Sequence, residues 1–348
     1  MEKFKIVDLF SGAGGLSLGF ENAGFESVLA LDMWNDAIDT YNYNRKNKVG
    51  VVSDIASINS NFLKKNIKGK INGVIGGPPC QGFSLAGKRS VDDVRNQLYK
   101  EYFRVLNEIK PDFFVLENVA GILNLDNGKF KDAIIKNATD IGYHMFVKKL
   151  IASDYGVPQN RVRVFFIGIK NEKVNDEFEF PKKHDLKITS KEALSDLPLL
   201  KQTDKQTKYS SEPKNEYQKI MRKNSKEVFN HENSKHTEET IELISHIPEG
   251  GSIKDLPEKL KGDRKYSSLL RRMNSKEPSN TIDTGHRTYF HYKENRIITV
   301  REAARLQSFP DNYFFTGGKQ SQYKQVGNAV PPILAKEVAL SIIKYLYK

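Results

Sequence analysis

The chain has 348 residues, 38% of them hydrophobic, enough for one large or two ordinary domains with a real core. A single cysteine excludes an intramolecular disulfide, no cysteine and histidine cluster has zinc-ligand spacing, and no apolar run approaches the roughly 20 residues that span a bilayer. We therefore expect a cytoplasmic protein with no metal site and no membrane contact, and the formal net charge of +12 favours a polyanionic partner.

The chain begins with a predicted strand, a glycine turn and a helix. Residues 5–10 form a short apolar run, and the glycine-rich segment 11–15 leads into an apolar pattern typical of a helix. This order is the start of a nucleotide-type fold. Ser17 stands where the third glycine of the dinucleotide fingerprint would fall, so a pyrophosphate cradle is not indicated.

Acidic residues accompany the next two predicted strands. A strand near 27–31 ends at Asp32, and a strand over 51–55 carries Asp54 near its end. Carboxylates at the ends of adjacent strands suit the ribose hydroxyls and the amino group of a nucleoside. Capping of a helix is the alternative for either acid.

The only cysteine, Cys80, follows a predicted fourth strand over 71–75. Paired glycines and prolines before it stop the strand and restrict the backbone, which puts the thiol on a loop at a strand's carboxyl end. A free cysteine is usually a small buried hydrophobe, but rigid polar flanks argue against that here. The polar segment 84–96 lacks periodicity, and we predict a mobile lid whose phosphate contacts are Lys88, Arg89 and Arg95.

Two further groups are candidates for a functional role. The strand 111–116 is followed by Glu117, and partial burial of this carboxylate would raise its pKa and let it hold a proton near neutrality. A capping acid is the alternative. Alternation along a strand in 159–168 puts Arg161 and Arg163 on one face, where they suit an anion or a carbonyl-rich ligand. A solvated pair on an edge strand is the other interpretation.

From about residue 171 the composition changes. Residues 182–234 are rich in polar residues, which predicts an inserted, loop-dominated second domain. A short amphipathic helix is expected over 241–247, and Arg271 and Arg272 are candidates for contacts to bases or phosphates. Thr299 is the expected cap of a helix that a proline stops at position 310, and a last helix runs to Leu346.

Six of these segments resemble, in the family's order, the motifs of DNA (cytosine-5) methyltransferases, and the match covers essentially the whole chain. The matching segments are Asp8-Leu9-Phe10-Ser11-Gly12-Ala13-Gly14-Gly15, Gly77-Pro78-Pro79-Cys80-Gln81-Gly82-Phe83-Ser84, Glu117-Asn118-Val119, Gln159-Asn160-Arg161-Val162-Arg163, Arg301-Glu302-Ala303-Ala304-Arg305-Leu306-Gln307-Ser308-Phe309-Pro310 and Gly327-Asn328-Ala329-Val330.

The resemblance implies an α/β fold. This is the Rossmann-like fold of S-adenosylmethionine-dependent methyltransferases, a mostly parallel twisted sheet with helices on both faces, plus a smaller loop-rich target-recognition domain. The catalytic domain would comprise residues 1–185, completed by 322–348, and the target-recognition domain with its hinge would comprise 186–321.

The resemblance also implies roles for single residues. Cys80 would attack carbon 6 of a flipped cytosine, Glu117 would hydrogen-bond or protonate ring nitrogen 3, and Arg163, with Arg161 nearby, would hold the ring oxygen. The cofactor S-adenosyl-L-methionine would be bound by Phe10, Gly12, Gly14, Gly15, Leu16, Asp32, Met33, Asp54, Ile55, Pro79, Asn328 and Ala329. DNA would be contacted by Gln81, Ser84, Lys88, Arg89, Arg95, Arg271, Arg272 and Arg287.

We therefore expect a bacterial enzyme that methylates carbon 5 of a cytosine within a specific double-stranded DNA sequence. It would act as a monomer, associated with the nucleoid through DNA, in a restriction-modification system whose cognate endonuclease acts separately. A non-catalytic binding protein of the same fold is disfavoured because Cys80, Glu117, Arg161 and Arg163 occur together. The insert favours DNA over a tRNA substrate, and the missing third glycine disfavours a dehydrogenase.

Overall fold

The structure is a computed structural model, which describes residues 3–79, 98–200, 207–261, 270–285 and 288–347. Contacts group the chain into two compact units. The first unit comprises Met1–Ile151, Val162–Lys182 and Leu334–Lys348, and the second comprises Ala152–Arg161 and Lys183–Ile333. The second unit thus takes residues 152–161, 183–185 and 322–333 from the segments that the sequence analysis assigned to the catalytic domain. The functional boundaries themselves stay a prediction.

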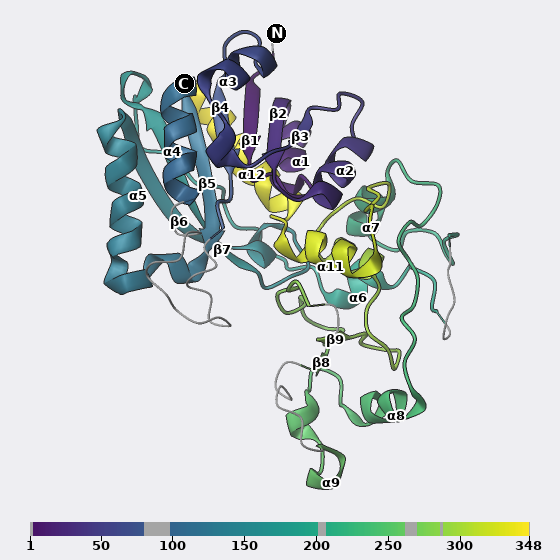
Figure 1. Ribbon diagram of the computed structural model, residues 1–348. Coiled ribbons are helices and arrows are strands. Elements are labelled where there is room, and N and C mark those ends of the chain that lie inside the picture. Colours follow the sequence, from purple (N-terminus) through teal and green to yellow (C-terminus); the bar gives the residue numbers. More distant parts are fainter. Residues whose placement is uncertain (1–2, 80–97, 201–206, 262–269, 286–287, 348) are drawn as a thin grey trace. The chain divides into compact units, whose positions relative to one another are not determined.

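The first unit is built on one sheet (Figure 1). Its strands in the described residues follow the order β3-β2-β1-β4-β5-β7-β6. Pairs from β3 to β5 are parallel, whereas β7 runs antiparallel to both β5 and β6. This mostly parallel sheet confirms the predicted fold class. The strands are β1 Lys5–Leu9, β2 Glu26–Asp32, β3 Gly50–Val52, β4 Gly73–Gly76, β5 Phe113–Val119, β6 Tyr143–Ile151 and β7 Val162–Lys170.

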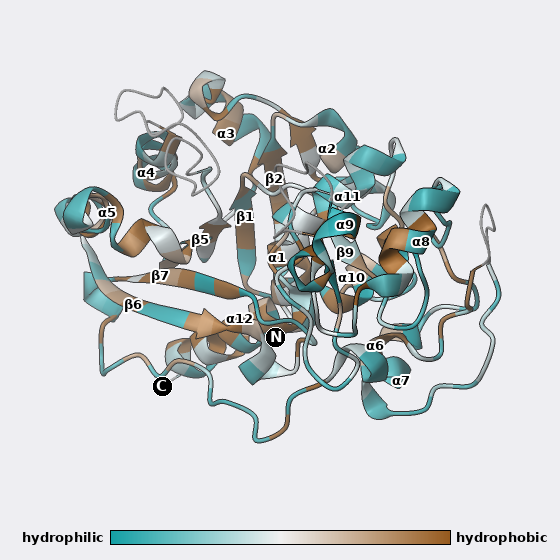
Figure 2. Cartoon of the chain, turned by 90° about the horizontal axis from the view of Figure 1, so that it is seen from below, coloured by the Kyte–Doolittle hydropathy of each residue, from teal (hydrophilic) through white to brown (hydrophobic). Residues whose placement is uncertain are grey.

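Helices cover both faces of this sheet. One face packs against α3 (Ser60–Asn66), α4 (Leu98–Ile109) and α5 (Lys129–Asp140), whose apolar side chains join those of the strands in one cluster. The other helices of the unit are α1 (Gly15–Asn22), α2 (Asn35–Tyr43) and α12 (Pro332–Leu346). Figure 2 shows hydrophobic residues along β5 and β7 and a mainly hydrophilic α5. Burial of the sheet on both faces explains its apolar strands.

The end of the chain contains one helical stretch, Lys319–Leu346, that is long and apolar enough to cross a membrane. Three non-helical residues at 329–331 interrupt it, and 56% of its most apolar window is buried. The core helix of a globular protein has the same properties, so this stretch is weak evidence for a membrane span.

The second unit consists of short elements joined by long loops, as the composition predicts. Thr299 caps α10: its hydroxyl accepts from the amide of Glu302 at 3.1 Å, and the Glu302 carboxylate accepts from the Thr299 amide at 2.7 Å. The unit contains α6 Ser190–Leu194, α7 Glu216–Arg222, α8 Glu238–His246, α9 Glu258–Lys261, β8 Arg271–Arg272, β9 Tyr289–Phe290, α10 Val300–Leu306 and α11 Lys319–Asn328.

Both units also contain single turns of 3-10 helix. In the first unit these lie at Ile55–Ser57, Ala120–Leu123, Leu125–Gly128 and Asn171–Lys173, and in the second they lie at Ala152–Tyr155 and Ile253–Asp255.

Buried ion pairs hold the second unit together around α10. The Arg305 guanidinium donates to Asp311 at 2.6 Å through Nε and to Asp196 at 2.8 Å through Nη1. All three side chains are buried. Burial by itself would raise the pKa of Asp311, but the Arg305 charge and its hydrogen bonds outweigh burial and hold that pKa below its usual range. The unit therefore depends on complete pairing of these charges.

Replacing Arg305 with leucine should cost the second unit about 3–5 kcal/mol of unfolding free energy, because buried Asp196 and Asp311 lose their closest counter-charge and keep only Arg222 at 3.3 Å and Arg301 at 4.0 Å. Urea denaturation of wild type and variant measures the loss. Lys219→Leu is the control, since its ammonium pairs with Glu216 on the surface and should contribute little. Equal urea midpoints for wild type and Arg305→Leu would show that this network is dispensable.

Candidate active site

The loop after β1 is held in a strained shape at the carboxyl edge of the parallel strands. Phe10, Gly12 and Gly14 have φ angles of 59°, 52° and 83°, in the left-handed region. A Cβ at Gly14 would lie 2.6 Å from the Tyr41 ring, so this position requires glycine. A Cβ at Gly12 would meet no atom within 4 Å in the described residues, so space for a ligand lies beside it.

Asp32 connects the end of β2 to this loop. Its carboxylate accepts from the Gly12 amide at 2.8 Å and from the Trp34 amide at 2.9 Å. Asp54 caps a 3-10 helix by accepting from the Ala56 amide at 3.0 Å, which is the alternative that the sequence left open. Asp54 keeps further acceptor capacity, because a carboxylate has about four lone-pair sites.

Two apolar side chains are exposed at the same strand ends. Met33 is 73% exposed and Val52 is 46% exposed. Exposed apolar side chains next to acceptor groups match the demands of a nucleoside, which has an apolar ring and polar hydroxyls. The residues present therefore fit a nucleoside-bearing cofactor such as S-adenosyl-L-methionine. Leu16 and Ile55 are buried, so their side chains belong to the core of the unit.

A buried acid lies behind the glycine loop, and the sequence analysis assigned it no function. Asp8 is 1% exposed and accepts a hydrogen bond from Ser17, whose hydroxyl in turn accepts from Tyr41 at 3.3 Å. Arg45 stacks on the Tyr41 ring at 3.6 Å and donates to the Gly14 carbonyl at 3.2 Å. The other oxygen of Asp8 has no hydrogen-bond partner among the described residues.

Burial raises the pKa of Asp8 to about 7, an effect that Ser17 and Arg45 reduce and that Glu21 and Asp32 reinforce. An acid within an apolar strand run was the available sequence signal for this group. Its position under the first turn of α1 makes it a structural support of the predicted cofactor loop.

The raised pKa predicts a pH dependence of stability. Between pH 4 and 7 the folded protein keeps a proton on Asp8 that the unfolded chain releases, so the free energy of unfolding falls as pH rises. Asp8 contributes at most about 1.4 kcal/mol per pH unit. Asp8→Asn removes this slope, and urea denaturation of both proteins at several pH values measures the difference. Parallel profiles would show that Asp8 is ionised throughout this range.

Glu117 and Arg163 form a buried ion pair near the end of β5. The Arg163 Nε lies 2.8 Å from Glu117 Oε1, and only 13% and 10% of the two side chains are exposed. Antiparallel pairing of β5 with β7 brings them together, with Val119 opposite Arg163. Burial lowers the pKa of Arg163, while the Glu117 charge opposes that change.

The segment that leads to Cys80 contacts β5, the strand that carries Glu117. Asn118 donates from Nδ2 to the Pro78 carbonyl at 2.9 Å. A Cβ at Gly77 would lie 2.9 Å from Glu117 Oε2, so the backbone passes directly beside the carboxylate. The structure therefore brings Glu117, Arg163 and residues 77–79 together. Outside the described residues lie Cys80, Gln81, Ser84, Lys88, Arg89, Arg95 and Arg287.

Arg161 does not share a strand face with Arg163. β7 begins at Val162, and Arg161 belongs to the second unit. Its guanidinium is buried and donates to the carbonyls of Ile282 at 2.9 Å and Gly327 at 2.7 Å. The strand prediction for this pair was wrong, because tertiary hydrogen bonds to backbone carbonyls hold Arg161 where the local alternation pattern predicted a neighbouring cation.

The second unit holds the other predicted site residues. Arg271 is exposed, but Arg272 is buried and donates to the Ile244 carbonyl and, at 2.7 Å, to Asn295 Oδ1. These contacts give Arg272 a structural role in place of the predicted DNA contact. Asn328 is exposed at the end of α11, and the carbonyl of Ala329 accepts from Gln307. A cofactor role for these two residues stays a prediction.

One cluster among the described residues has metal-ligand chemistry, formed by His291, Glu294 and Glu302. Arg296 donates to Glu294 at 2.9 Å and to Glu302 at 2.8 Å. Burial lowers the pKa of His291 to about 4. A guanidinium already supplies the positive charge between the two carboxylates, so this cluster is an ion-pair network.

Known proteins resemble the chain along nearly its whole length. The family model of C-5 cytosine-specific DNA methylases matches residues 4–344. The chain is 39% identical over 370 residues to the Type II methyltransferase M.DdeI of Desulfomicrobium norvegicum, covering 98% of this chain and 88% of the relative. It is also 39% identical over 347 residues to M1.HphI of Haemophilus parahaemolyticus, covering 97% and 86%.

Solved structures show the same similarity. The crystal structure of a putative DNA modification methyltransferase encoded within an E. coli prophage aligns with a TM-score of 0.83 and 28% identity, covering 99% of this chain and 100% of that one. The Dnmt2 methyltransferase of S. pombe aligns with a TM-score of 0.60 at 17% identity, which shows a shared fold.

Proposed function

This chain belongs to the C-5 cytosine-specific DNA methylase family, and from that premise we propose how it acts. It transfers a methyl group to carbon 5 of a cytosine in a specific double-stranded DNA sequence, through base flipping and a covalent bond to Cys80. The observation that carries the proposal is the Glu117–Arg163 ion pair at 2.8 Å, beside the backbone that leads to the only cysteine.

Glu117 and Arg163 offer complementary hydrogen-bonding groups to one edge of the cytosine ring. A cytosine ring presents a nitrogen at position 3 and a carbonyl oxygen at position 2, and both gain electron density when a nucleophile adds to carbon 6. Glu117 hydrogen-bonds or protonates the nitrogen. Arg163 has five N–H donors, of which one bonds the Val162 carbonyl while Nε lies 2.8 Å from Glu117 Oε1, so further donors can serve the ring oxygen.

The Cys80 thiolate forms a bond to carbon 6 as the π bond between carbons 5 and 6 breaks, and the electron pair of that π bond makes carbon 5 nucleophilic. S-adenosyl-L-methionine, when bound, supplies the electrophilic methyl group. Loss of the proton from carbon 5 and release of the thiolate then restore the aromatic ring. A free thiol has a pKa near ~8.5, so cationic surroundings are needed to raise the thiolate fraction, and we propose that Arg163 contributes to them.

Stacking in a duplex hides carbon 6, so the cytosine must leave the helix before attack. The polar segment after Cys80 is the part of the chain proposed to close over the flipped base. Phe10, Gly12, Asp32, Met33 and Asp54 would hold the cofactor through the loop and the strand ends described above. Pro79 would lie next to the cofactor, and Asn328 and Ala329 are proposed to complete its site.

The relatives support a biological setting. The two relatives described above are both named Type II methyltransferases. We propose that this protein is the modification enzyme of a bacterial restriction-modification system, acting in the cytoplasm as a monomer on chromosomal DNA, with a separate cognate endonuclease. A tRNA substrate is the second candidate, and parallel assays with duplex DNA and tRNA distinguish the two.

Cys80→Ser should abolish methyl transfer while cofactor and DNA binding persist, because a serine hydroxyl is far less ionised than a thiol near neutral pH. Bisulfite sequencing of DNA from expressing cells locates the methylated cytosine. Duplex DNA with 5-fluorocytosine at that site should trap the wild type in a complex stable to denaturant, and Cys80→Ser should form none. Wild-type activity in the serine variant would refute Cys80 as the nucleophile.

Glu117→Gln and Arg163→Met should each lower kcat by roughly 10²–10³-fold, since each removes one group that stabilises charge on the ring. The KM for S-adenosyl-L-methionine should stay within about twofold of wild type. Steady-state kinetics with tritiated cofactor measure both constants. Asp140→Asn is the matched control, because Asp140 forms an exposed ion pair with Lys136 at 2.6 Å in the same unit. A variant of Glu117 with full kcat contradicts its assigned role.

A further inference from the structure

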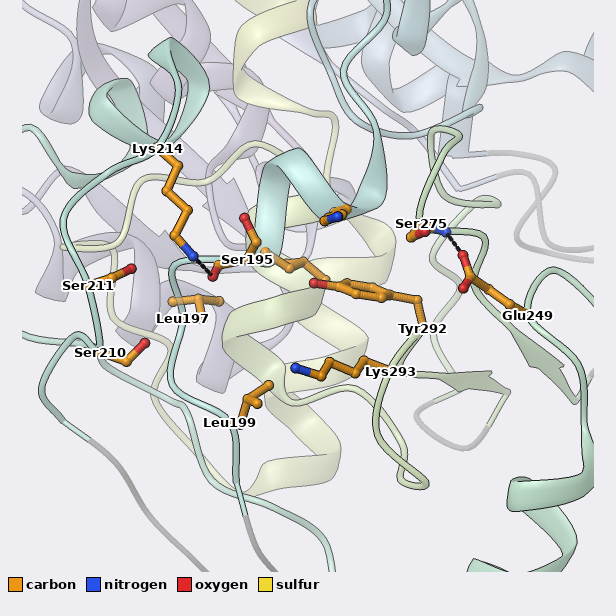
Figure 3. Close-up of a pocket in the computed structure, with 12 residues that line it drawn as sticks. Ser195, Leu197, Leu199, Ser210, Ser211, Lys214, Glu249, Ser275, Tyr292 and Lys293 are labelled. Carbon is orange, nitrogen blue, oxygen red and sulfur yellow. Dashed lines mark hydrogen bonds between the residues drawn. The ribbon is translucent and has the colours of Figure 1, made fainter.

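The second unit contains a cavity of about 750 Å³ that the mechanism above does not use. Figure 3 shows its lining, with Lys214 and Lys293 on different sides of the Tyr292 ring. The lining side chains come from five stretches of the chain around α6, α7 and β9. We call it the lysine cavity and define it by Lys191, Ser195, Ser211, Lys214, Tyr292 and Lys293.

The lysine cavity has an excess of positive charge. In the described part of the chain, no carboxylate lies within ion-pair distance of Lys191, Lys214 or Lys293, and Lys214 donates to the Ser195 carbonyl at 2.9 Å. The acid in the lining, Glu249, accepts from the Ser275 amide at 2.5 Å, and hydrogen bonds from the side chain and the amide of Ser275 lower the pKa of Glu249. Three lysine ammonium groups therefore line the cavity together with one carboxylate, which already accepts a hydrogen bond.

Other lysines of the same unit behave differently. Lys219, Lys261 and Lys319 each lie within 3.2 Å of a glutamate carboxylate. A solvated lysine face is the ordinary interpretation of exposed lysines, and mixed charges usually accompany it. Lysines that surround a concave space without a carboxylate partner produce a local positive potential, which favours an anionic ligand.

The hydroxyl groups of the cavity add donor capacity. Ser211 Oγ is buried and has no hydrogen-bond partner among the described residues. Burial raises the pKa of Tyr292 to about 12, so its hydroxyl keeps its proton at neutral pH. Ser195 Oγ accepts from Gln218 at 3.1 Å, which leaves its own proton available to donate. The ligand that matches these groups is an anion with several acceptor oxygens.

We propose that the lysine cavity binds phosphate esters, and that a backbone phosphate of duplex DNA is the ligand in the enzyme's reaction. A phosphate carries negative charge and two or more acceptor oxygens, which matches three ammonium groups and the adjacent hydroxyls. The assignment of DNA as the source rests on the proposed function. A free nucleotide offers the same phosphate chemistry and is the other source.

The test compares a cavity variant with a control of equal charge. Lys191→Glu/Lys293→Glu reverses two cations of the lysine cavity, and Lys226→Glu/Lys235→Glu reverses two exposed lysines of the same unit outside it. Fluorescence anisotropy of a cognate duplex at 50–200 mM salt measures affinity. If two phosphate contacts are lost, the salt slope falls by about two, and the affinity change across this range becomes roughly tenfold smaller than in wild type. The control keeps the wild-type slope.

Isothermal titration with inorganic phosphate and with AMP provides the second arm. Loss of duplex affinity in the cavity variant supports the backbone as the source, and loss of phosphate or AMP binding alone supports a free phosphate ester. Ser211→Ala is a milder variant that should weaken the same ligand, and circular dichroism verifies folding of all variants. Equal binding of all three probes by wild type, Ser211→Ala and the cavity variant overturns the proposal.

Methyl transfer by the wild type is measured separately. An inactive wild type would count against the proposed function, whereas the phosphate and AMP titrations would still decide whether the lysine cavity binds its ligand class. An active wild type with a cavity variant that binds every probe normally would overturn the cavity proposal alone.

Discussion

The candidate active site depends on the salt bridge between Glu117 and Arg163, which is largely buried from solvent. Glu117 and Arg163 lie 2.8 Å apart with little exposure, and burial of two charges carries a desolvation cost that their attraction offsets only with good geometry. The geometry comes from the sheet. Because β7 runs antiparallel beside β5, the end of one strand meets the start of the other, and an acid and a base from distant parts of the chain become neighbours. An all-parallel arrangement would place the start of β7 at the opposite edge.

The glycine loop shows how the same sheet edge prepares a ligand site. Backbone in the left-handed region at Phe10 costs free energy, and the surroundings must hold it in place. Asp32 holds the loop by accepting from the Gly12 amide. The hydrogen-bonded series Tyr41–Ser17–Asp8 supports the loop from the interior of the unit. The open space at Gly12 and the filled space at Gly14 distinguish two glycines that look equivalent in the sequence.

The second unit combines apolar packing with buried charge. It has an apolar cluster around α8 and β9, and α10 places Arg301, Glu302 and Arg305 in the interior, each with hydrogen-bond partners. Directional hydrogen bonds of this kind can fix the positions of long loops, which dispersion contacts alone specify poorly. The lysine cavity contrasts with this network, since its cations have no carboxylate partner among the described residues.

Local sequence patterns determined much of this protein. Apolar runs bounded by glycine and acids located the parallel strands, Thr299 marked the start of α10, and the ordered motifs indicated the family and singled out Glu117 and Arg163 as site residues. These features depend on residues close together in the chain, through periodicity, capping and turn chemistry. The tertiary structure alone decided which polar side chains are buried and which groups form hydrogen bonds or ion pairs with them. It separated Arg161 from Arg163, enclosed Arg272, placed Asp8 under the glycine loop and assembled the lysine cavity, because each of these outcomes depends on contacts between residues far apart in the sequence.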